Sequence, residues 1–343
     1  MKPTYITLFC LFFIVLGIPS LIVSFSPKEA MSVSTTEGKP KKMEPIEPKS
    51  KKSNKEEELT VSVYRMADKN IENVEIEEYV MGVLSAEMPI NFEIEALKAQ
   101  AVAARTYTVR NLLHPDTSKL PQGADVTDST LHQVYNNTSE LKERWGTKYE
   151  ENINKLKQAV SDTEGMIITY QGEPIDASFF STSNGYTENS EDYWSASIPY
   201  LRSVPSPWDK DSPVFIESKR FTINEFESKV GVSISNKGNI GEIERTSSKR
   251  VASVRINEKK LSGKDLRESL GLKSTDFTFK LEGGHITITT KGNGHGVGMS
   301  QYGANGMAKA GKNYKDILKH YYTDIAIEDV YSNQILKKAF AKK

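Results

Sequence analysis

The chain has 343 residues, enough for two ordinary domains or for one domain with a large insertion. Its 45 basic and 45 acidic residues cancel, which argues against a global electrostatic field that favours nucleic acid or a charged membrane. Hydrophobic residues make up 37% of the sequence, so a substantial core can form. With Cys10 as its one cysteine, the chain forms neither an intrachain disulfide nor a metal site made of cysteines alone.

An uncharged run, YITLFCLFFIVLGIPSLIVSF, occupies residues 5–25 near the N-terminus. It is long enough to cross the ~30 Å hydrocarbon core of a bilayer as a helix. A cleaved signal peptide is the alternative, but Lys28 stands where an A-x-A-type cleavage site carries a small residue. We therefore expect residues 1–25 to be a cytoplasmic tip and a retained single-pass membrane anchor, with the rest of the chain outside the cytoplasm.

Residues 26–58 are rich in Lys, Glu, Pro and Ser and poor in apolar side chains, a composition typical of a disordered linker. The alternation in LTVSVYRM (59–66) then predicts a strand. The next stretch, VEIEEYVMGVLSAE (74–87), has the periodicity of a helix. Its apolar residues on one helical face are Tyr79, Val80, Val83 and Leu84.

Two predicted helices meet around Pro89. Pro89 ends the first helix, because the residue before a proline avoids the helical region. The alanine-rich stretch 93–113 predicts a second, buried helix, and Glu93 and Glu95 suit the positive end of its dipole. Glu87 therefore stands at the joint, either as a solvated helix end or as a carboxylate placed there for chemistry.

The middle of the chain predicts one helix over residues 143–165 and a hairpin over residues 166–183. Residues 215–280 contain two short helices with one layout, each with a capping box and a closing glycine. The capping pairs are Thr222 with Glu225 and Ser262 with Asp265. Strands are predicted between these helices, so this stretch resembles an inserted unit.

These elements predict an α+β fold. We expect an N-terminal transmembrane helix and disordered tether, followed by a mixed α/β catalytic core with an inserted smaller α+β subdomain. The core is formed by residues 59–214 and 281–343, and the subdomain by residues 215–280.

Residues 292–298 (GNGHGVG) follow a predicted strand and precede a predicted helix, as a phosphate-binding loop does. The G-x-G-x-x-G spacing fails, because its third glycine position falls on Val297 or Met299. No Walker-type Lys with Ser or Thr follows either, which argues against a nucleotide site. The glycines instead predict a backbone that passes close to another group and presents His295 on a tight turn.

Three sets of motifs are recognisable together: LSAEMP with EALKAQAVAARTY, FFSTSNGYTENSEDYW with YLRSVPSPWD, and GNGHGVGMSQYGA. They resemble the stage II sporulation protein D family, also described as amidase-enhancer-like lytic transglycosylases. The resemblance runs from about Leu59 to the C-terminal helix, and the anchor and tether also fit it.

This resemblance implies a membrane-anchored enzyme that cleaves peptidoglycan glycan strands between N-acetylmuramic acid and N-acetylglucosamine. The implied cleavage is non-hydrolytic, leaves a 1,6-anhydro end and acts on strands stripped of their peptides. The resemblance also implies work with a membrane-bound amidase and a polytopic membrane protein during forespore engulfment. That role would place the protein in the septal or engulfing membrane of the mother cell.

The implied chemistry can be tested against the residues. An ordinary glycosidase needs two carboxylates about 5–9 Å apart, whereas a lytic transglycosylase can work with one acid. That acid protonates the glycosidic oxygen and later accepts a proton from the attacking sugar hydroxyl, which requires a pKa raised towards neutrality. Desolvation between two apolar helices and the negative end of a helix dipole both raise the pKa of Glu87. Glu87 is therefore the predicted sole catalytic acid and base.

Arg105 matches the family's AARTY motif and lies on the same predicted helix as Gln100. Arg105 is predicted to position the substrate or to orient Glu87, and the alternative is a helix arginine paired with a surface acid. Tyr200 and Arg202 alternate on an extended stretch, so both can point to one face, where a ring and a donor suit a sugar. Packing of Tyr200 in a core is its alternative. The other residues predicted to line the groove are Gln100, Ser181, Asn184, His295, Ser300 and Gln301.

Some relatives carry a metal site around the stretch that here reads ADVTDSTLHQVY, with cysteines where this chain has Thr127 and His132. Those ligands are missing, and His114 with His132 is too small a set for a closed zinc site. We therefore expect neither a metal nor a cofactor.

Two other classes of function remain open. A non-catalytic glycan-binding scaffold that recruits or enhances a cell-wall amidase could carry the same motifs. Glu87→Gln separates it from the enzyme, because only the enzyme loses cleavage while binding remains. A structural assembly protein would instead depend on the linker and on residues 215–280.

Overall fold

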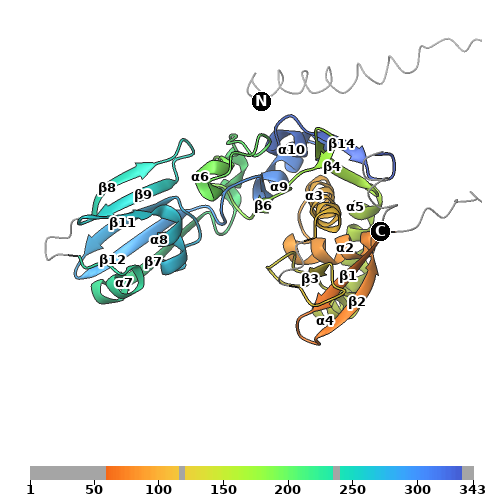
Figure 1. Ribbon diagram of the computed structural model, residues 1–343, viewed down its shortest axis with the longest axis horizontal. Helices are drawn as coiled ribbons and strands as arrows, with labels where there is room; N and C mark the ends of the chain where they lie inside the picture. The colour runs from red at the N-terminus through yellow and green to blue at the C-terminus, as the bar shows by residue number, and fades with distance from the viewer. Residues whose placement is uncertain (1–58, 116–119, 235–239, 334–343) are drawn as a thin grey trace, which may run out of the picture. The chain divides into compact units, whose positions relative to one another are not determined.

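The computed structural model describes residues 59–115, 120–234 and 240–333. The predicted membrane anchor and linker lie outside these ranges. Within them, no helix combines the length and the apolar character that a membrane span needs. The described residues form a mixed α+β fold, as the sequence predicts (Figure 1).

The first part of the fold joins a small sheet to two packed helices. β1 pairs antiparallel with β2 and parallel with β3. α2 follows β2 without a loop and packs against α3, which is buried along most of its length. The elements of this part are β1 (Thr60–Arg65), β2 (Asn70–Glu75), α2 (Ile76–Glu87), α3 (Ile94–Leu113) and β3 (Val126–Thr127).

The face predicted for the first helix is confirmed, because Tyr79, Val80, Val83 and Leu84 are all inaccessible to solvent. They belong to the larger of two hydrophobic clusters. α3 runs through this cluster and is contacted there by α5, β4, α9 and α10. α3 is therefore the central element of the core, and α2 with Glu87 at its end is fixed against it.

One long helix was predicted over residues 143–165, and this is wrong. The structure has two helices, because Gly146 with a φ of +51° ends the first of them. That helix begins at a capping box formed by Asn137 and Glu140. The segments are α4 (Thr138–Trp145), the 3₁₀ turn η2 (Gly146–Lys148) and α5 (Tyr149–Ser161).

The hairpin predicted over residues 166–183 is confirmed only in its first half. β4 pairs antiparallel with the short β5 and, on its other side, with β14 near the C-terminus. β6 leaves this sheet and pairs in parallel with β13. The strands are β4 (Met166–Tyr170), β5 (Glu173–Pro174), β6 (Phe179–Phe180), β13 (Met299–Ser300) and β14 (Ala326–Asp329).

Residues 215–291 build two three-stranded sheets, in the orders β11–β12–β7 and β10–β9–β8, around the second hydrophobic cluster. α7 and α8 contact each other and pack on these strands (Figure 1). The strands are β7 (Ile216–Thr222), β8 (Ile240–Arg245), β9 (Val251–Ile256), β10 (Lys259–Ser262), β11 (Phe277–Glu282) and β12 (His285–Lys291). The helices are α7 (Ile223–Val230) and α8 (Gly263–Leu270).

Local signals in this smaller part agree with the sequence. The capping box of Thr222 and Glu225 is formed, and Ser262 accepts from the Asp265 N–H. The boundary predicted at residue 280 falls inside β11, whose partner β12 follows it. The division into domains otherwise remains a prediction.

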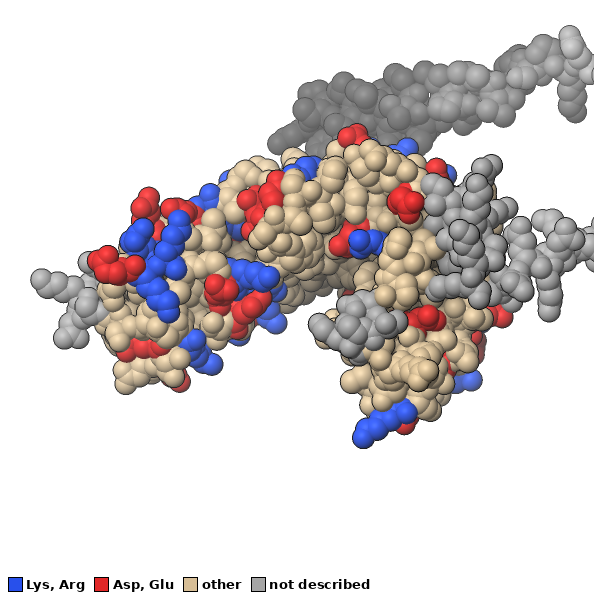
Figure 2. Space-filling view, viewed as in Figure 1, with Lys and Arg blue, Asp and Glu red and all other residues tan. Residues whose placement is uncertain are grey.

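The remaining helices of the described chain are short, and α9 and α10 among them pack in the larger cluster. They are α6 (Ser190–Trp194), the 3₁₀ turn η3 (Pro207–Asp211), α9 (Gln301–Lys309) and α10 (Tyr314–Tyr321). Acidic and basic side chains are interspersed on the face shown in Figure 2, in keeping with the zero net charge of the chain.

Candidate functional site

Glu87 is the last residue of α2. The Met88 N–H closes the final turn on the Leu84 carbonyl, and Pro89 follows in an exposed position. The Glu87 carbonyl accepts a hydrogen bond of 2.9 Å from Gln301 Nε2 at the start of α9. The backbone of Glu87 is thus held from the far end of the sequence, and its side chain remains partly exposed.

Residues 133–136, named here the strap, cross α2 next to Glu87. The Val134 N–H is directed at the Glu87 carboxyl. On one side of it the Gln133 amide oxygen accepts from Thr108 on α3 at 3.2 Å. On the other side the Asn136 amide donates to Ser85 Oγ at 3.2 Å. The strap therefore links α3 to the last turns of α2 and supplies a backbone donor that faces the carboxyl.

Gly82 makes room for the strap. A Cβ at this position would lie 2.4 Å from the Tyr135 ring and 2.5 Å from the Asn136 carbonyl oxygen. The Tyr135 ring also stacks on Tyr79 at a centroid distance of 5.2 Å. Glycine in a helix interior lowers helix stability by about 1 kcal/mol relative to alanine. At position 82 the glycine allows the backbone of the strap to approach the backbone of α2 closely.

Burial raises the pKa of the Glu87 carboxyl above its ordinary value, and the Val134 N–H opposes this rise. Within the described part of the chain no charged side chain contributes to the shift. Glu87 is therefore a carboxyl with a raised pKa, and among the described residues neither a second carboxylate nor a cation contributes to that shift. This is the electrostatic setting of an acid that both gives and accepts a proton.

Three of the predicted groove residues lie together at the start of α9. Gln301 holds the Glu87 carbonyl, and Ser300 caps α9 by accepting from the Gly303 N–H. Ser300 Oγ also lies 3.4 Å from the Ser181 carbonyl oxygen. Ser300 is completely buried, so it organises this region from within the fold.

Asp209 is a residue that the sequence did not identify as functional. It is inaccessible to solvent and accepts from the Ser183 N–H at 2.8 Å and from the hydroxyls of Ser183, Ser206 and Ser300. Burial raises its pKa while these donors lower it. Asp209 thus connects the three motif stretches that contain SNGYT, SPWD and MSQYG. Its position in the SPWD motif was the sequence feature that could have identified it as a candidate functional residue.

Arg105 lies at the opposite end of α2 from Glu87. Its guanidinium is completely buried and forms a bidentate pair with Glu77, with Nε 2.8 Å from Oε1, and Nη1 donates to the Met166 carbonyl at 3.0 Å. Glu77 and Glu87 are ten residues apart, roughly 15 Å along a helix axis. Contact of Arg105 with Glu87 is therefore not formed, and the alternative of a helix arginine paired with an acid fits the geometry. Gln100 is also completely buried, and its amide has no partner among the described residues.

The Arg105–Glu77 pair predicts a large stability effect. Arg105→Met leaves the Glu77 carboxylate without its cation, which we expect to cost about 3–5 kcal/mol of unfolding free energy. Arg110→Met is the matched control on the same helix, because Arg110 is exposed and 3.8 Å from Asp176, and should cost below about 1 kcal/mol. Urea unfolding measures both. Equal stabilities together with a raised KM for Arg105→Met would favour the substrate role instead.

Tyr200 and Arg202 have different partners. The Tyr200 hydroxyl accepts from the Asp176 N–H at 2.9 Å, and its ring lies 5.4 Å from Tyr170. Arg202 forms a bidentate pair with Glu191 and also donates to the Ile198 carbonyl. The ion pair lowers the pKa of the Glu191 carboxyl to about 2. Tyr200 is half-buried, and Arg202 anchors α6.

Asn184 connects the motif region to the smaller part of the fold. Its amide donates to the Ser248 carbonyl and to Asp276 Oδ2, both at 2.9 Å. These contacts involve neither Glu87 nor the strap.

His295 is fixed through both ring nitrogens. The Val297 N–H donates to Nδ1 at 3.1 Å, so Nε2 carries the proton and donates to the Phe179 carbonyl at 3.0 Å. Its ring lies 5.1 Å from that of Trp194 and 5.7 Å from those of Phe180 and Tyr193. Burial, with smaller contributions from two arginines, lowers the pKa of His295 to about 4.

The lowered pKa of His295 predicts a pH dependence of stability. The unfolded chain takes up a proton at about pH 6.5, whereas the folded chain takes it up at about 4. Stability contributed by neutral His295 is therefore present above pH 6.5 and is lost as the pH falls towards 4. Melting temperatures between pH 7 and 4 should fall less steeply for His295→Gln than for wild type, and parallel curves would contradict this.

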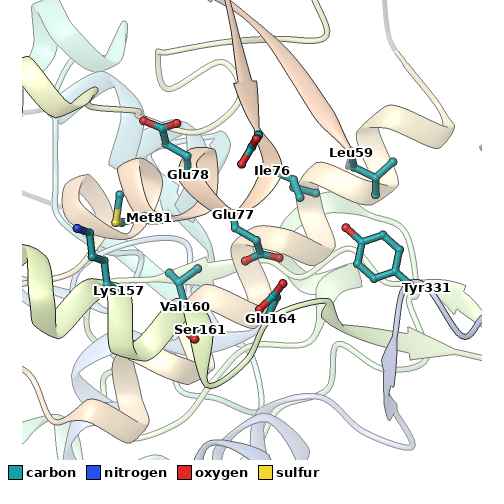
Figure 3. A pocket seen from close by; sticks show the side chains of 11 residues that line it. Leu59, Ile76, Glu77, Glu78, Met81, Lys157, Val160, Ser161, Glu164 and Tyr331 are labelled. Atoms are coloured by element: carbon teal, nitrogen blue, oxygen red, sulfur yellow. The ribbon is translucent and has the colours of Figure 1, made fainter. Parts of the chain in front are cut away.

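A cavity of about 340 Å³ lies at the start of α2, away from Glu87. Figure 3 shows Glu77 in the middle of this cavity, with Lys157 and Tyr331 at its sides. Its glutamates include Glu77, whose carboxylate is already paired with Arg105. In the residues described, no group of three or more His, Cys, Asp or Glu is arranged to hold a metal ion.

Comparison with known proteins agrees with the family resemblance of the sequence. A family model described as "Stage II sporulation protein" matches residues 64–170. The stage II sporulation protein D of Bacillus amyloliquefaciens is 47% identical over the full length of both chains. The chain belongs to the stage II sporulation protein D family. The family member of Bacillus subtilis is 46% identical over 98% of this chain and all of its own.

A more distant relative extends the comparison. The protein named "Amidase enhancer" from Bacillus subtilis is 32% identical over 70% of this chain and 39% of its own length. The family is one of sporulation proteins, and in this chain Glu87 contacts both the strap and the start of α9.

Proposed function

We propose that this family member is a membrane-anchored lytic transglycosylase with Glu87 as its sole acid and base. Its substrate is the bond between N-acetylmuramic acid and N-acetylglucosamine in peptide-stripped peptidoglycan. The observation that carries the proposal is the setting of Glu87: a half-buried carboxyl with a raised pKa, one backbone donor and no compensating charge among the described residues.

The proposed reaction balances without a water molecule. The Glu87 carboxyl donates its proton to the glycosidic oxygen, and the bond from that oxygen to C1 of the muramic acid breaks. The 6-hydroxyl of the same sugar forms the new bond to C1 and gives its proton to the Glu87 carboxylate. The acid is thereby restored, and the product carries a 1,6-anhydro end.

The position of Glu87 supports both halves of this cycle. Burial and the C-terminal end of α2 disfavour the carboxylate, so the group stays protonated to a higher pH than an exposed glutamate does. The Val134 N–H stabilises the carboxylate that exists between the two steps. Gln301 fixes the backbone of Glu87, so that the side chain starts from a defined point.

We further propose that the uncharged run near the N-terminus anchors the protein in the septal or engulfing membrane of the mother cell, with the catalytic part outside the cytoplasm. There the chain would act on strands from which a membrane-bound amidase has removed the peptides, next to a polytopic membrane protein. A glycan-binding scaffold that enhances such an amidase is the second candidate, and the relative named amidase enhancer favours it.

Product analysis separates the two candidates. The full-length chain, wild type or Glu87→Gln, is incubated with peptide-stripped strands, with and without EDTA, and the products are examined by mass spectrometry. The enzyme predicts anhydro-ended fragments from the wild type alone, and they persist in EDTA. If both proteins bind the strands and neither cuts them, the enzyme is excluded and the glycan-binding scaffold is the function that remains.

A further inference from the structure

A second cavity, of about 330 Å³, lies where α6 meets the strands and helix of the smaller part of the fold. Its size is within the range of small-molecule sites, roughly 300–1,000 Å³. It shares no lining residue with the surroundings of Glu87. The lining residues are Glu188, Glu191, Asp192, Tyr193, Trp194, Ser195, Thr246, Arg250, Val251, Ala252, Ser262, Lys264 and Thr275.

Two buried charged residues form its polar wall. The Glu188 carboxylate accepts hydrogen bonds of 2.8 Å from the hydroxyls of Thr246 and Ser248. Arg250 is 2% exposed and donates from Nη1 to Ser248 at 2.9 Å and from Nη2 to the Tyr186 carbonyl at 3.1 Å. Its Nε–H has no acceptor among the described residues. Nε is itself inaccessible to solvent beside Gly296, so a ligand in the cavity does not reach it.

The glycine-rich turn at residues 292–298 packs closely against Arg250. Gly296, in the glycine-rich turn, has a φ of +91°, and a Cβ there would lie 2.5 Å from the guanidinium carbon of Arg250. The turn therefore leaves space for this side chain. The close approach of Arg250 explains why residue 296 of the GNGHGVG motif is a glycine, although it has no role in the proposed chemistry of Glu87.

Two aromatic rings form the other wall. Trp194 and Tyr193 are both half-buried and meet edge to face at 5.6 Å. Arg267 donates to the Tyr193 hydroxyl at 2.8 Å, and Lys264 Nζ lies 5.0 Å from the Tyr193 ring centre. These cations hold Tyr193 in place, so the aromatic wall is built before any ligand arrives.

The charges around the cavity are largely compensated. Glu191 is paired with Arg202, and Glu188 and Arg250 are bridged through Ser248. The combination of rings and hydroxyls suits a ligand with an apolar face and several polar groups.

We propose that this cavity is a second glycan subsite that binds one N-acetylhexosamine unit of a strand, remote from Glu87. The apolar face of the sugar packs on Trp194, and its polar groups pair with the hydroxyls of Thr246 and Ser262 in the cavity lining. This inference rests on the proposed function, because it assigns the ligand from the same glycan strand. Binding far from the reacting bond raises affinity for long strands, so the subsite affects KM and leaves kcat unchanged.

The test uses the full-length chain carrying Glu87→Gln and the tetramer of N-acetylglucosamine, with calorimetry as readout. Trp194→Ala should weaken binding by about tenfold, and Trp194→Phe should restore most of it. Ala252→Leu adds bulk at an exposed position of the cavity and should weaken binding similarly. Thr278→Leu is the matched control, since it adds the same side chain to an exposed position of β11 outside the cavity.

A second readout separates this inference from the proposed function. In the chain with Glu87 intact, Ala252→Leu should raise KM for long peptide-stripped strands with kcat unchanged, relative to Thr278→Leu. Equal binding and equal KM for the two leucine variants would overturn the subsite even if cleavage depends on Glu87. The expected binding pattern without any strand cleavage would keep the subsite and reject the transglycosylase.

Discussion

Glu87→Gln is expected to reduce strand cleavage by about 100- to 10,000-fold, the contribution typical of a general acid and base. Glutamine has nearly the same shape and leaves the contact of Gln301 with the backbone intact, but its amide cannot donate the proton that the leaving oxygen needs. Glu93→Gln is the matched control, because Glu93 is exposed and stands just before α3. Initial rates on peptide-stripped strands measure both, and equal rates for Glu87→Gln and Glu93→Gln would exclude Glu87 as the acid.

The same substitution is expected to stabilise the fold at neutral pH. Burial raises the pKa of Glu87 in the folded chain above that of the unfolded chain, so the folded state binds more protons between the two values. The contribution of Glu87 to stability is thus present below the unfolded pKa, about 4.3, and is lost as the pH rises through the folded value. Glutamine does not titrate, and its advantage in urea unfolding should appear at pH 7 and vanish near pH 4. An advantage independent of pH would contradict the raised pKa.

Gly82→Ala is expected to inactivate the protein without touching the carboxyl. Alanine improves helix propensity by about 1 kcal/mol, but its Cβ would meet the Asn136 carbonyl oxygen at 2.5 Å, a backbone atom that no rotamer change can move. Overpacking of this kind costs about 1–3 kcal/mol and shifts the strap away from α2. Since the strap carries the Val134 N–H, we expect a loss of activity on the order of 100-fold.

The pH–rate profile makes this prediction specific to the strap. The Val134 N–H lowers the pKa of Glu87, so its withdrawal should move the profile's Glu87 pKa upwards. Met81→Ala, next to Gly82 on the same helix, leaves the strap contacts in place and should keep the wild-type profile. If Gly82→Ala lost stability and kept both the rate and the profile, the strap would have no part in setting Glu87.

The position of Glu87 could be predicted because it depends on local rules. Pro89 ends the helix, the spacing of Tyr79 and Val83 sets the buried face, and the caps at Thr222 and Ser262 mark helix starts. Each of these signals acts over a few residues. Local signals did not suffice everywhere, because Gly146 divides the helix predicted over residues 143–165.

The surroundings of Glu87 could not be predicted, because they come from segments far apart in the sequence. The strap has no hydrophobic periodicity, and Gln301 reaches Glu87 across 214 positions. Arg105 was given a role at Glu87 because it shares a motif with that region, but packing directs it to Glu77. Gly82, in the middle of a helix, was a signal of close backbone approach that the sequence did contain.

Cleavage of peptide-stripped strands in ¹⁸O-labelled water tests the central claim most directly. If Glu87 acts alone and the sugar's own 6-hydroxyl attacks, the wild-type products carry 1,6-anhydro ends without ¹⁸O. Glu87→Gln should then yield neither anhydro-ended nor hydrolysed fragments. Reducing ends that contain one ¹⁸O would show that water is the nucleophile, and the single-acid transglycosylase would be contradicted.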